Sequence, residues 1–120
     1  MQNKDQEYAR YWDTIRNILQ NNISYKGVQI ARAGSRVQGG WTDKSDLDIR
    51  FSLKGDPSKQ SVYPELVRLL KQNIPKANVE IGNSYNVINM SVDGLEFDIV
   101  LLTTQDFNEQ VRNSKLKRIT

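Results

Sequence analysis

The sequence predicts one α/β domain over residues 1–120, of the mixed α+β type. Apolar residues recur with the period of a helix in some segments and with the period of a strand in others. A hairpin signal follows near the end of the chain. We therefore expect a mixed sheet of about five strands, with helices packed mainly on one face. A chain of 120 residues is long enough to bury one hydrophobic core.

The first part of the chain is expected to form a helix and two strands. From Asn3 to Asn22 the apolar residues recur at three- and four-residue spacing, which predicts an amphipathic helix. Val28–Ala33 is a short strand that leads into a turn and a short helix, and Leu47–Leu53 alternates apolar and polar residues like a half-buried strand. The apolar face of the helix consists of Tyr8, Tyr11, Trp12, Ile15, Ile18 and Leu19.

A second helix is expected after the polar loop Lys54–Gln60, which contains a glycine and a proline. Its predicted span is Ser61–Asn73, with Ser61 as the N-cap and Pro75 as the residue that stops it. The residues expected to face the core are Leu66, Leu69 and Leu70.

Three short strands and a last helix follow. Asp93-Gly94 predicts a two-residue hairpin turn between the second and third of these strands. Thr104 is expected to cap a helix over Gln105–Asn113, after which the basic tail Lys115–Arg118 frays. The predicted strands are Asn78–Ile81, Val87–Val92 and Leu95–Leu102.

If the chain is an enzyme, its composition requires carboxylates to carry the chemistry. The chain has no cysteine and no histidine, which excludes disulfides, thiolate nucleophiles, His- or Cys-ligated zinc and Ser-His-Asp hydrolysis. Carboxylates suit hard cations such as Mg²⁺ or Mn²⁺. The net charge of +3 and pI of about 9.2 fit a polyanionic partner. No apolar run approaches a membrane span and the N-terminus has no apolar core, so we expect a cytoplasmic protein with no membrane contact.

A glycine-rich turn follows the first predicted strand. Gly34-Ser35 offers backbone N–H groups and a hydroxyl donor at the start of the next element, which suits a phosphate. Most Gly-Ser turns are only turns, so this feature by itself favours a structural role.

Two aspartates open the next strand. Residues two apart on a strand point to the same face, so Asp46 and Asp48 bring two carboxylates side by side, which is costly unless a cation lies between them. The alternative is a strand-entry residue followed by a solvated strand position.

Asp98 is a third candidate, because it lies in the otherwise apolar segment Phe97–Leu102. A charge in such a strand is expensive to bury unless it is paired or ligates a metal. An exposed position on an edge strand is the alternative. If this strand lies beside that of Asp48, the carboxylates converge. Glu96 shares the face of Asp98 and is the reserve candidate, while Asp98 is preferred because Phe97 and Ile99 are expected to enclose it symmetrically.

Together these motifs resemble the polymerase-beta-like nucleotidyltransferase superfamily. The resemblance consists of Gly34-Ser35, Gly39 five positions later, Ser45-Asp46-Leu47-Asp48-Ile49 and Phe97-Asp98-Ile99, within a match from about Ile30 to Thr103. The spacing around Ser45-Asp46 resembles the minimal nucleotidyltransferases, and the gap to Asp98 resembles the catalytic palm of CCA-adding enzymes and poly(A) polymerases.

The resemblance implies a two-metal transfer of a nucleoside monophosphate from an NTP, with ATP as the expected nucleotide, to an acceptor hydroxyl. Asp46 and Asp48 would bind both Mg²⁺ or Mn²⁺ ions, and Asp98 would bind one of them. Arg36, Arg50 and Lys44 are candidate electrostatic helpers, although ordinary surface charge is the alternative for each. The residues implied in nucleotide and phosphate binding are Gly34, Ser35, Arg36 and Gly39.

The acceptor is the open part of the prediction. Relatives often have threonine at the position of Gly40 and arginine at that of Gln38, and larger relatives add a helical domain after the palm, which a partner chain would have to supply here. Three hypotheses remain: transfer to RNA or a nucleotide, AMP transfer to a protein partner as in some toxin–antitoxin pairs, and a non-catalytic binding module. The sequence fits a whole small protein as well as the catalytic part of a longer one.

Overall fold

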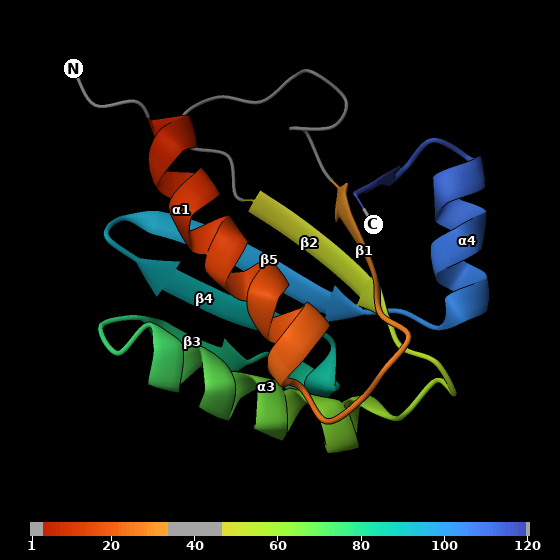
Figure 1. Ribbon diagram of the computed structural model, residues 1–120, viewed down its shortest axis with the longest axis horizontal. Coiled ribbons are helices and arrows are strands. Elements are labelled where there is room, and N and C mark those ends of the chain that lie inside the picture. Colours follow the sequence, from red (N-terminus) through yellow and green to blue (C-terminus); the bar gives the residue numbers. More distant parts are fainter. Residues whose placement is uncertain (1–3, 34–46, 120) are drawn as a thin grey trace.

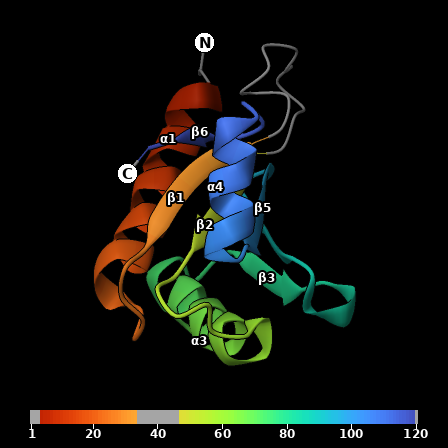
Figure 2. The same ribbon diagram turned by 90° about the vertical axis from the view of Figure 1, so that its right-hand side faces the viewer.

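The computed structural model describes residues 4–33 and 47–119, which form one sheet with helices on both of its faces. The helices α1 and α3 cover one face of the sheet, and α4 packs on the other face near the opposite edge (Figures 1 and 2). The predicted α/β class with a mixed sheet is confirmed. The short helix predicted after Val28–Ala33 lies outside the described residues.

The sheet has six strands in the order β3-β4-β5-β2-β1-β6. Four of its five pairings are antiparallel, and the pairing of β2 with β5 is parallel. β5 and β2 therefore lie in the middle of the sheet. The strands are β1 (Gln29–Ala33), β2 (Leu47–Ser52), β3 (Asn78–Ile81), β4 (Ile88–Val92), β5 (Leu95–Leu101) and β6 (Lys117–Arg118).

The helices cover the sheet with the faces that the apolar pattern predicts. The first helix is α1 (Lys4–Asn17), which continues as a π-helical turn over Ile18–Asn22. The other helices are α3 (Lys59–Asn73) and α4 (Thr104–Arg112). None of the helices in the described ranges has an apolar stretch long enough to cross a bilayer. The buried residues of the first helix are the predicted set Tyr8, Tyr11, Trp12, Ile15, Ile18 and Leu19.

Both predicted helix caps were wrong by a few residues. Helix α3 starts before Ser61, and its N-cap is Ser58, whose Oγ accepts a hydrogen bond from the Ser61 N–H at 3.2 Å. Helix α4 is capped by Thr103, whereas the Thr104 hydroxyl donates to Asp56 at 2.9 Å. In each case a neighbouring hydroxyl residue with extended backbone provides the cap, which spacing alone does not distinguish.

The basic tail does not fray, which explains why the sheet has more strands than the predicted five. Lys117 and Arg118 form β6, which pairs antiparallel with β1. The Arg118 guanidinium donates to Gln29 Oε1 at 2.6 Å, and Leu116 is buried against Phe107 of α4. This packing places α4 on the second face of the sheet.

The predicted hairpin turn at Asp93-Gly94 is confirmed. Both residues have positive φ, 53° and 78°, as a type I′ turn requires. The Asp93 carboxylate accepts from the Tyr11 hydroxyl and forms an ion pair with Lys76 at 2.8 Å. The hydrogen bond from Lys76, followed by that from Tyr11, lowers the pKa of Asp93. The turn is thus tied to α1 and to the residues that follow α3.

One buried hydroxyl joins α3 to the middle of the sheet. The Tyr63 side chain accepts a hydrogen bond from the Leu101 N–H at 3.0 Å, and its hydroxyl donates to the Asn86 carbonyl at 3.3 Å. Burial raises the pKa of Tyr63, opposed by the Leu101 hydrogen bond and by the charge of Arg50. The hydroxyl form is therefore the one that the folded protein favours.

We predict that Tyr63→Phe lowers the free energy of unfolding by about 1–3 kcal/mol at neutral pH, because the Leu101 N–H loses its buried partner. The raised pKa means that the unfolded chain ionises first, so wild-type stability decreases as the pH rises from the unfolded value of 10.0 through the folded value. Urea titrations of both proteins at pH 7 and above pH 10 should show a smaller difference at high pH. An equal difference at both values would contradict this role of Tyr63.

Candidate active site

The parallel pairing of β2 and β5 brings two of the predicted site residues together. In its register Asp48 lies directly opposite Asp98. Both strands run next to each other through the centre of the sheet (Figure 1). β5 pairs with β4 on its other side, so Asp98 is not on an edge strand and that alternative is excluded.

The two carboxylates lie on the face of the sheet opposite to α1 and α3. Side chains alternate along a strand, and Leu47, Ile49, Phe97 and Ile99 are buried in the core that those helices cover. Asp48 and Asp98 therefore point to the other face, where both are half-buried. Hence the flanking Phe97 and Ile99 do not enclose Asp98 as expected; they lie behind the sheet.

Neighbouring strands lie about 4.7–4.9 Å apart, so the side chains of paired positions on the same face start close together. Two ionised carboxylates at that separation repel each other, and a cation between them removes the cost. Asp48 and Asp98 thus offer hard oxygen donors at one point of the sheet. Within residues 4–33 and 47–119 no cluster of three acidic, His or Cys side chains suited to a metal is found.

The remaining predicted site residues cannot be placed. Asp46 and the phosphate-binding candidates fall between the two described ranges. Ala33, the last described residue before this gap, pairs with Asp48 across β1 and β2. Gly34, Ser35, Arg36 and Gly39 therefore stay predictions, as do Asp46 and Lys44.

Arg50 lies next to the aspartate pair on the same face, two residues after Asp48. Its Nη1 donates to the Ile49 carbonyl at 3.1 Å and, over a longer distance of 3.4 Å, to the Asp98 carbonyl. One guanidinium thus contacts the main chain of both strands where the aspartates face each other. Arg50 is half-buried, and its role as an electrostatic helper stays a prediction.

Further polar residues continue the aspartate row across the sheet. Asn89 of β4 lies opposite Asp98, and Glu80 of β3 lies opposite Asn89. The reserve candidate Glu96 is exposed on the same face, two residues before Asp98 on β5. Sequence inspection missed Asn89, although the hairpin turn contained the signal: pairing Val92 with Leu95 fixes Asn89 opposite Asp98.

Solved structures with the same fold exist, whereas no family model and no curated protein matches the sequence. Terminal uridylyl transferase 4 from Trypanosoma brucei with bound UPU has a TM-score of 0.61 to this chain and 22% identity, over 92% of this chain and 37% of that one. The chain has the fold of a nucleotidyltransferase palm. The same enzyme with bound UTP and UMP gives a TM-score of 0.58 and 20% identity, over 82% and 35% of the two chains. With bound ATP the values are 0.54 and 20%, over 93% and 35%.

This chain spans little more than a third of the length of those structures. At this level of identity the likeness extends to the fold, in agreement with the predicted resemblance.

We predict that Arg50→Met lowers the free energy of unfolding by about 1–2 kcal/mol, because two carbonyl groups lose a charged donor. Arg50→Lys keeps the charge but not the planar fork, so it should recover only part of this loss. Urea denaturation measures both. A neutral effect of Arg50→Met would show that the contact to the Asp98 carbonyl does not stabilise the strand pair.

Proposed function

We propose that the chain catalyses metal-dependent nucleotidyl transfer, moving a nucleoside monophosphate from an NTP to the terminal hydroxyl of an RNA acceptor. The observation that carries the proposal is the position of Asp48 directly opposite Asp98 on the open face of a palm-type sheet. No structural role in a small domain requires the facing carboxylates Asp48 and Asp98, and Asp46 lies two positions before Asp48 in the sequence.

The donor set fits a divalent cation. Asp48 and Asp98 provide hard carboxylate oxygens on adjacent strands, and the chain has no histidine or cysteine to favour a softer metal. Together with Asp46 they would hold Mg²⁺ or Mn²⁺, two ions in all by the resemblance. When bound, the cations would lower the pKa of the acceptor hydroxyl and neutralise charge on the phosphates.

The protein's own groups would bind and orient the reactants. Asp98 would lie beside the acceptor hydroxyl, whose oxygen forms a bond to the α-phosphorus while its proton passes to solvent. The bond from that phosphorus to the bridging oxygen breaks, and pyrophosphate leaves with the electron pair. Arg50 would hold Asp98 in place through its main chain. The groups proposed to bind the triphosphate are Gly34, Ser35, Arg36 and Gly39.

The structural neighbour suggests the class of substrate. Terminal uridylyl transferase 4 has been solved with UTP, CTP, GTP and ATP, and also with UMP and UPU. We carry the NTP class over to this chain without a choice of base, ATP being the sequence-based expectation, and take RNA as the acceptor. The alternative acceptor is a protein that receives AMP. The proposal also allows for a partner chain that supplies a helical domain.

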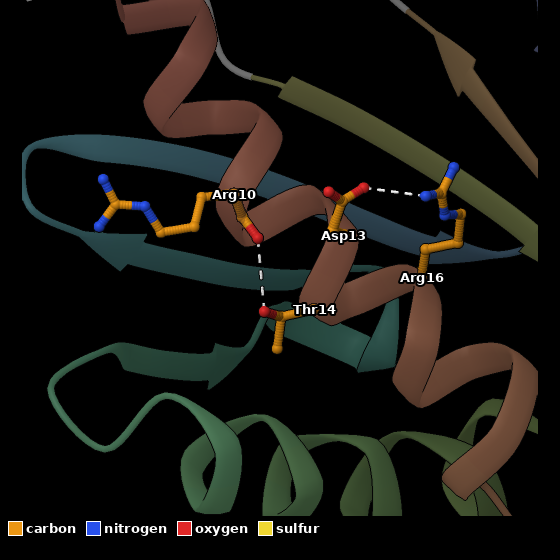
Figure 3. A network of polar contacts seen from close by, with 4 residues as sticks. All are labelled: Arg10, Asp13, Thr14 and Arg16. Carbon is orange, nitrogen blue, oxygen red and sulfur yellow. Dashed lines mark hydrogen bonds and ion pairs between the residues drawn. The ribbon is translucent and has the colours of Figure 1, made fainter.

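We predict that Asp48→Asn abolishes transfer, with a loss of at least about a hundredfold, while the fold persists, because a carboxylate ligand becomes an amide of similar volume. Asp13→Asn is the matched control. Asp13 is exposed on α1 and pairs with Arg16 at 2.9 Å, beside the hydrogen bond from Thr14 to Arg10 (Figure 3). Helix α1 covers the face of the sheet opposite to the aspartate pair. Asp13→Asn should keep wild-type activity.

The assay incubates each variant with labelled NTPs, Mg²⁺ or Mn²⁺, and either total RNA or cell extract. The proposal is supported if the wild-type protein labels RNA and Asp48→Asn does not. A labelled protein would indicate the protein-directed alternative. Full metal-dependent activity in Asp48→Asn, or no label on any acceptor, would contradict the assignment.

A further inference from the structure

A polar groove of about 480 Å³ opens on the same face of the sheet as the aspartate pair. Strands β3, β4 and β5 form its floor, and its polar lining consists of Asn78, Glu80, Asn89, Ser91, Glu96 and Asp98. We call it the sheet groove. Asp98 belongs both to the groove and to the candidate active site, so a molecule in the groove ends at the proposed reaction centre.

The strand registers arrange the groove in two parallel rows. In the first row Glu80 lies opposite Asn89 and Asn89 opposite Asp98. In the second, Asn78 lies opposite Ser91 and Ser91 opposite Glu96. Neighbours within a row are about 5 Å apart at Cβ, so each row forms a line of hydrogen-bonding groups that leads across the sheet.

These side chains are available to a ligand. In the described ranges no hydrogen bond or ion pair engages the side chains of Asn78, Glu80, Asn89, Ser91 or Glu96. The carboxylates of Glu80 and Glu96 accept hydrogen bonds from hydroxyl groups, and the amides of Asn78 and Asn89 both donate and accept. Sugar hydroxyls and the edge of a nucleobase present that combination of groups.

The charge of the groove selects against phosphate. Its described lining contains three carboxylates and no lysine or arginine, in a chain whose net charge is +3. A phosphate in the groove would face Glu80 and Glu96 at short range without a cation from the described part of the chain. The part of an acceptor that lies here is therefore one without phosphate.

We infer that the sheet groove binds the 3′-terminal ribonucleoside of the RNA acceptor through its sugar hydroxyls and base edge. This inference rests on the proposed transfer function and names the acceptor subsite of the same centre. The 3′ hydroxyl lies at Asp98, and the adjacent 2′ hydroxyl meets Asn89 or Glu96. The groove volume of about 480 Å³ is within the range of about 300–1,000 Å³ for small-molecule sites. A groove of this size suits one nucleoside better than the surface of a partner protein.

The test measures binding without catalysis. Isotope-labelled protein in EDTA is titrated with the four ribonucleosides, their 2′-deoxy counterparts, their 3′-monophosphates and a lysine-rich peptide, and amide shifts are followed by NMR. Ribonucleosides should shift the amides of residues 78–80, 89–91 and 96–98. The 2′-deoxynucleosides should bind about threefold or more weakly, and the 3′-monophosphates about tenfold or more weakly.

A charge-neutral variant tests the role of the carboxylates. Glu80→Gln with Glu96→Gln should weaken ribonucleoside binding about tenfold and reduce the discrimination against 3′-monophosphates, because charged acceptors become amides. Asp13→Asn with Glu109→Gln removes the same charge from the exposed surfaces of α1 and α4 and should change neither.

Three results would overturn the inference: no ribonucleoside shifts the groove amides, the 3′-monophosphates bind as tightly as the ribonucleosides, or the lysine-rich peptide binds the groove more tightly than any ribonucleoside. The last result would point to a protein acceptor. Since the titration contains no NTP and no metal, these results are separate from the transfer assay, and an inactive protein with normal nucleoside binding would contradict only the proposed function.

Discussion

The parallel pairing of β2 with β5 is the interaction on which the rest of the molecule depends. Parallel neighbours cannot be joined by a short turn, so the chain needs a crossover between them. Here the crossover consists of α3, β3 and β4, and the hairpin at Asp93-Gly94 returns the chain to the centre of the sheet. The Tyr63 hydroxyl on α3 receives the Leu101 N–H at the end of β5. Residues 53–94, about a third of the chain, thus connect the strand of Asp48 to the strand of Asp98.

The alternation of side chains separates stability from chemistry on these two strands. Every second residue, such as Ile49 and Ile99, is buried under α1 and α3, and the residues between them face the open side of the sheet. The same register that packs the core therefore aligns the carboxylates, and a slip by one residue would reverse both. On the open side the positively charged Arg50 contacts the main chain at the aspartate pair, and the carboxylates of the sheet groove extend from Asp98 toward β3.

Much of this arrangement could be predicted because it depends on local patterns. Helical and alternating periodicity located the elements to within a few residues, and the Asp93-Gly94 turn fixed one register. The β2–β5 pairing joins segments that are distant in the sequence, so it could not be predicted from local patterns. The convergence of Asp48 and Asp98 was therefore expected only if these two strands pair. The caps at Ser58 and Thr103 depend on which of several nearby hydroxyl residues has extended backbone, which spacing does not distinguish. The strand β6 and the contact of Arg50 with the Asp98 carbonyl depend on tertiary packing, which composition and spacing do not encode.

The proposed function requires Asp48 and Asp98 to form one cation site across two strands. An NMR titration of isotope-labelled protein with Mg²⁺, in the wild type and in Asp98→Asn, tests this requirement. We expect Mg²⁺ to shift the amides of residues 47–49 and 97–99 together, with a common dissociation constant. In Asp98→Asn the shifts on both strands should weaken about tenfold or more, since one of the facing ligands is lost. Shifts confined to one strand, or shifts on residues 47–49 that keep the wild-type affinity in Asp98→Asn, would contradict it.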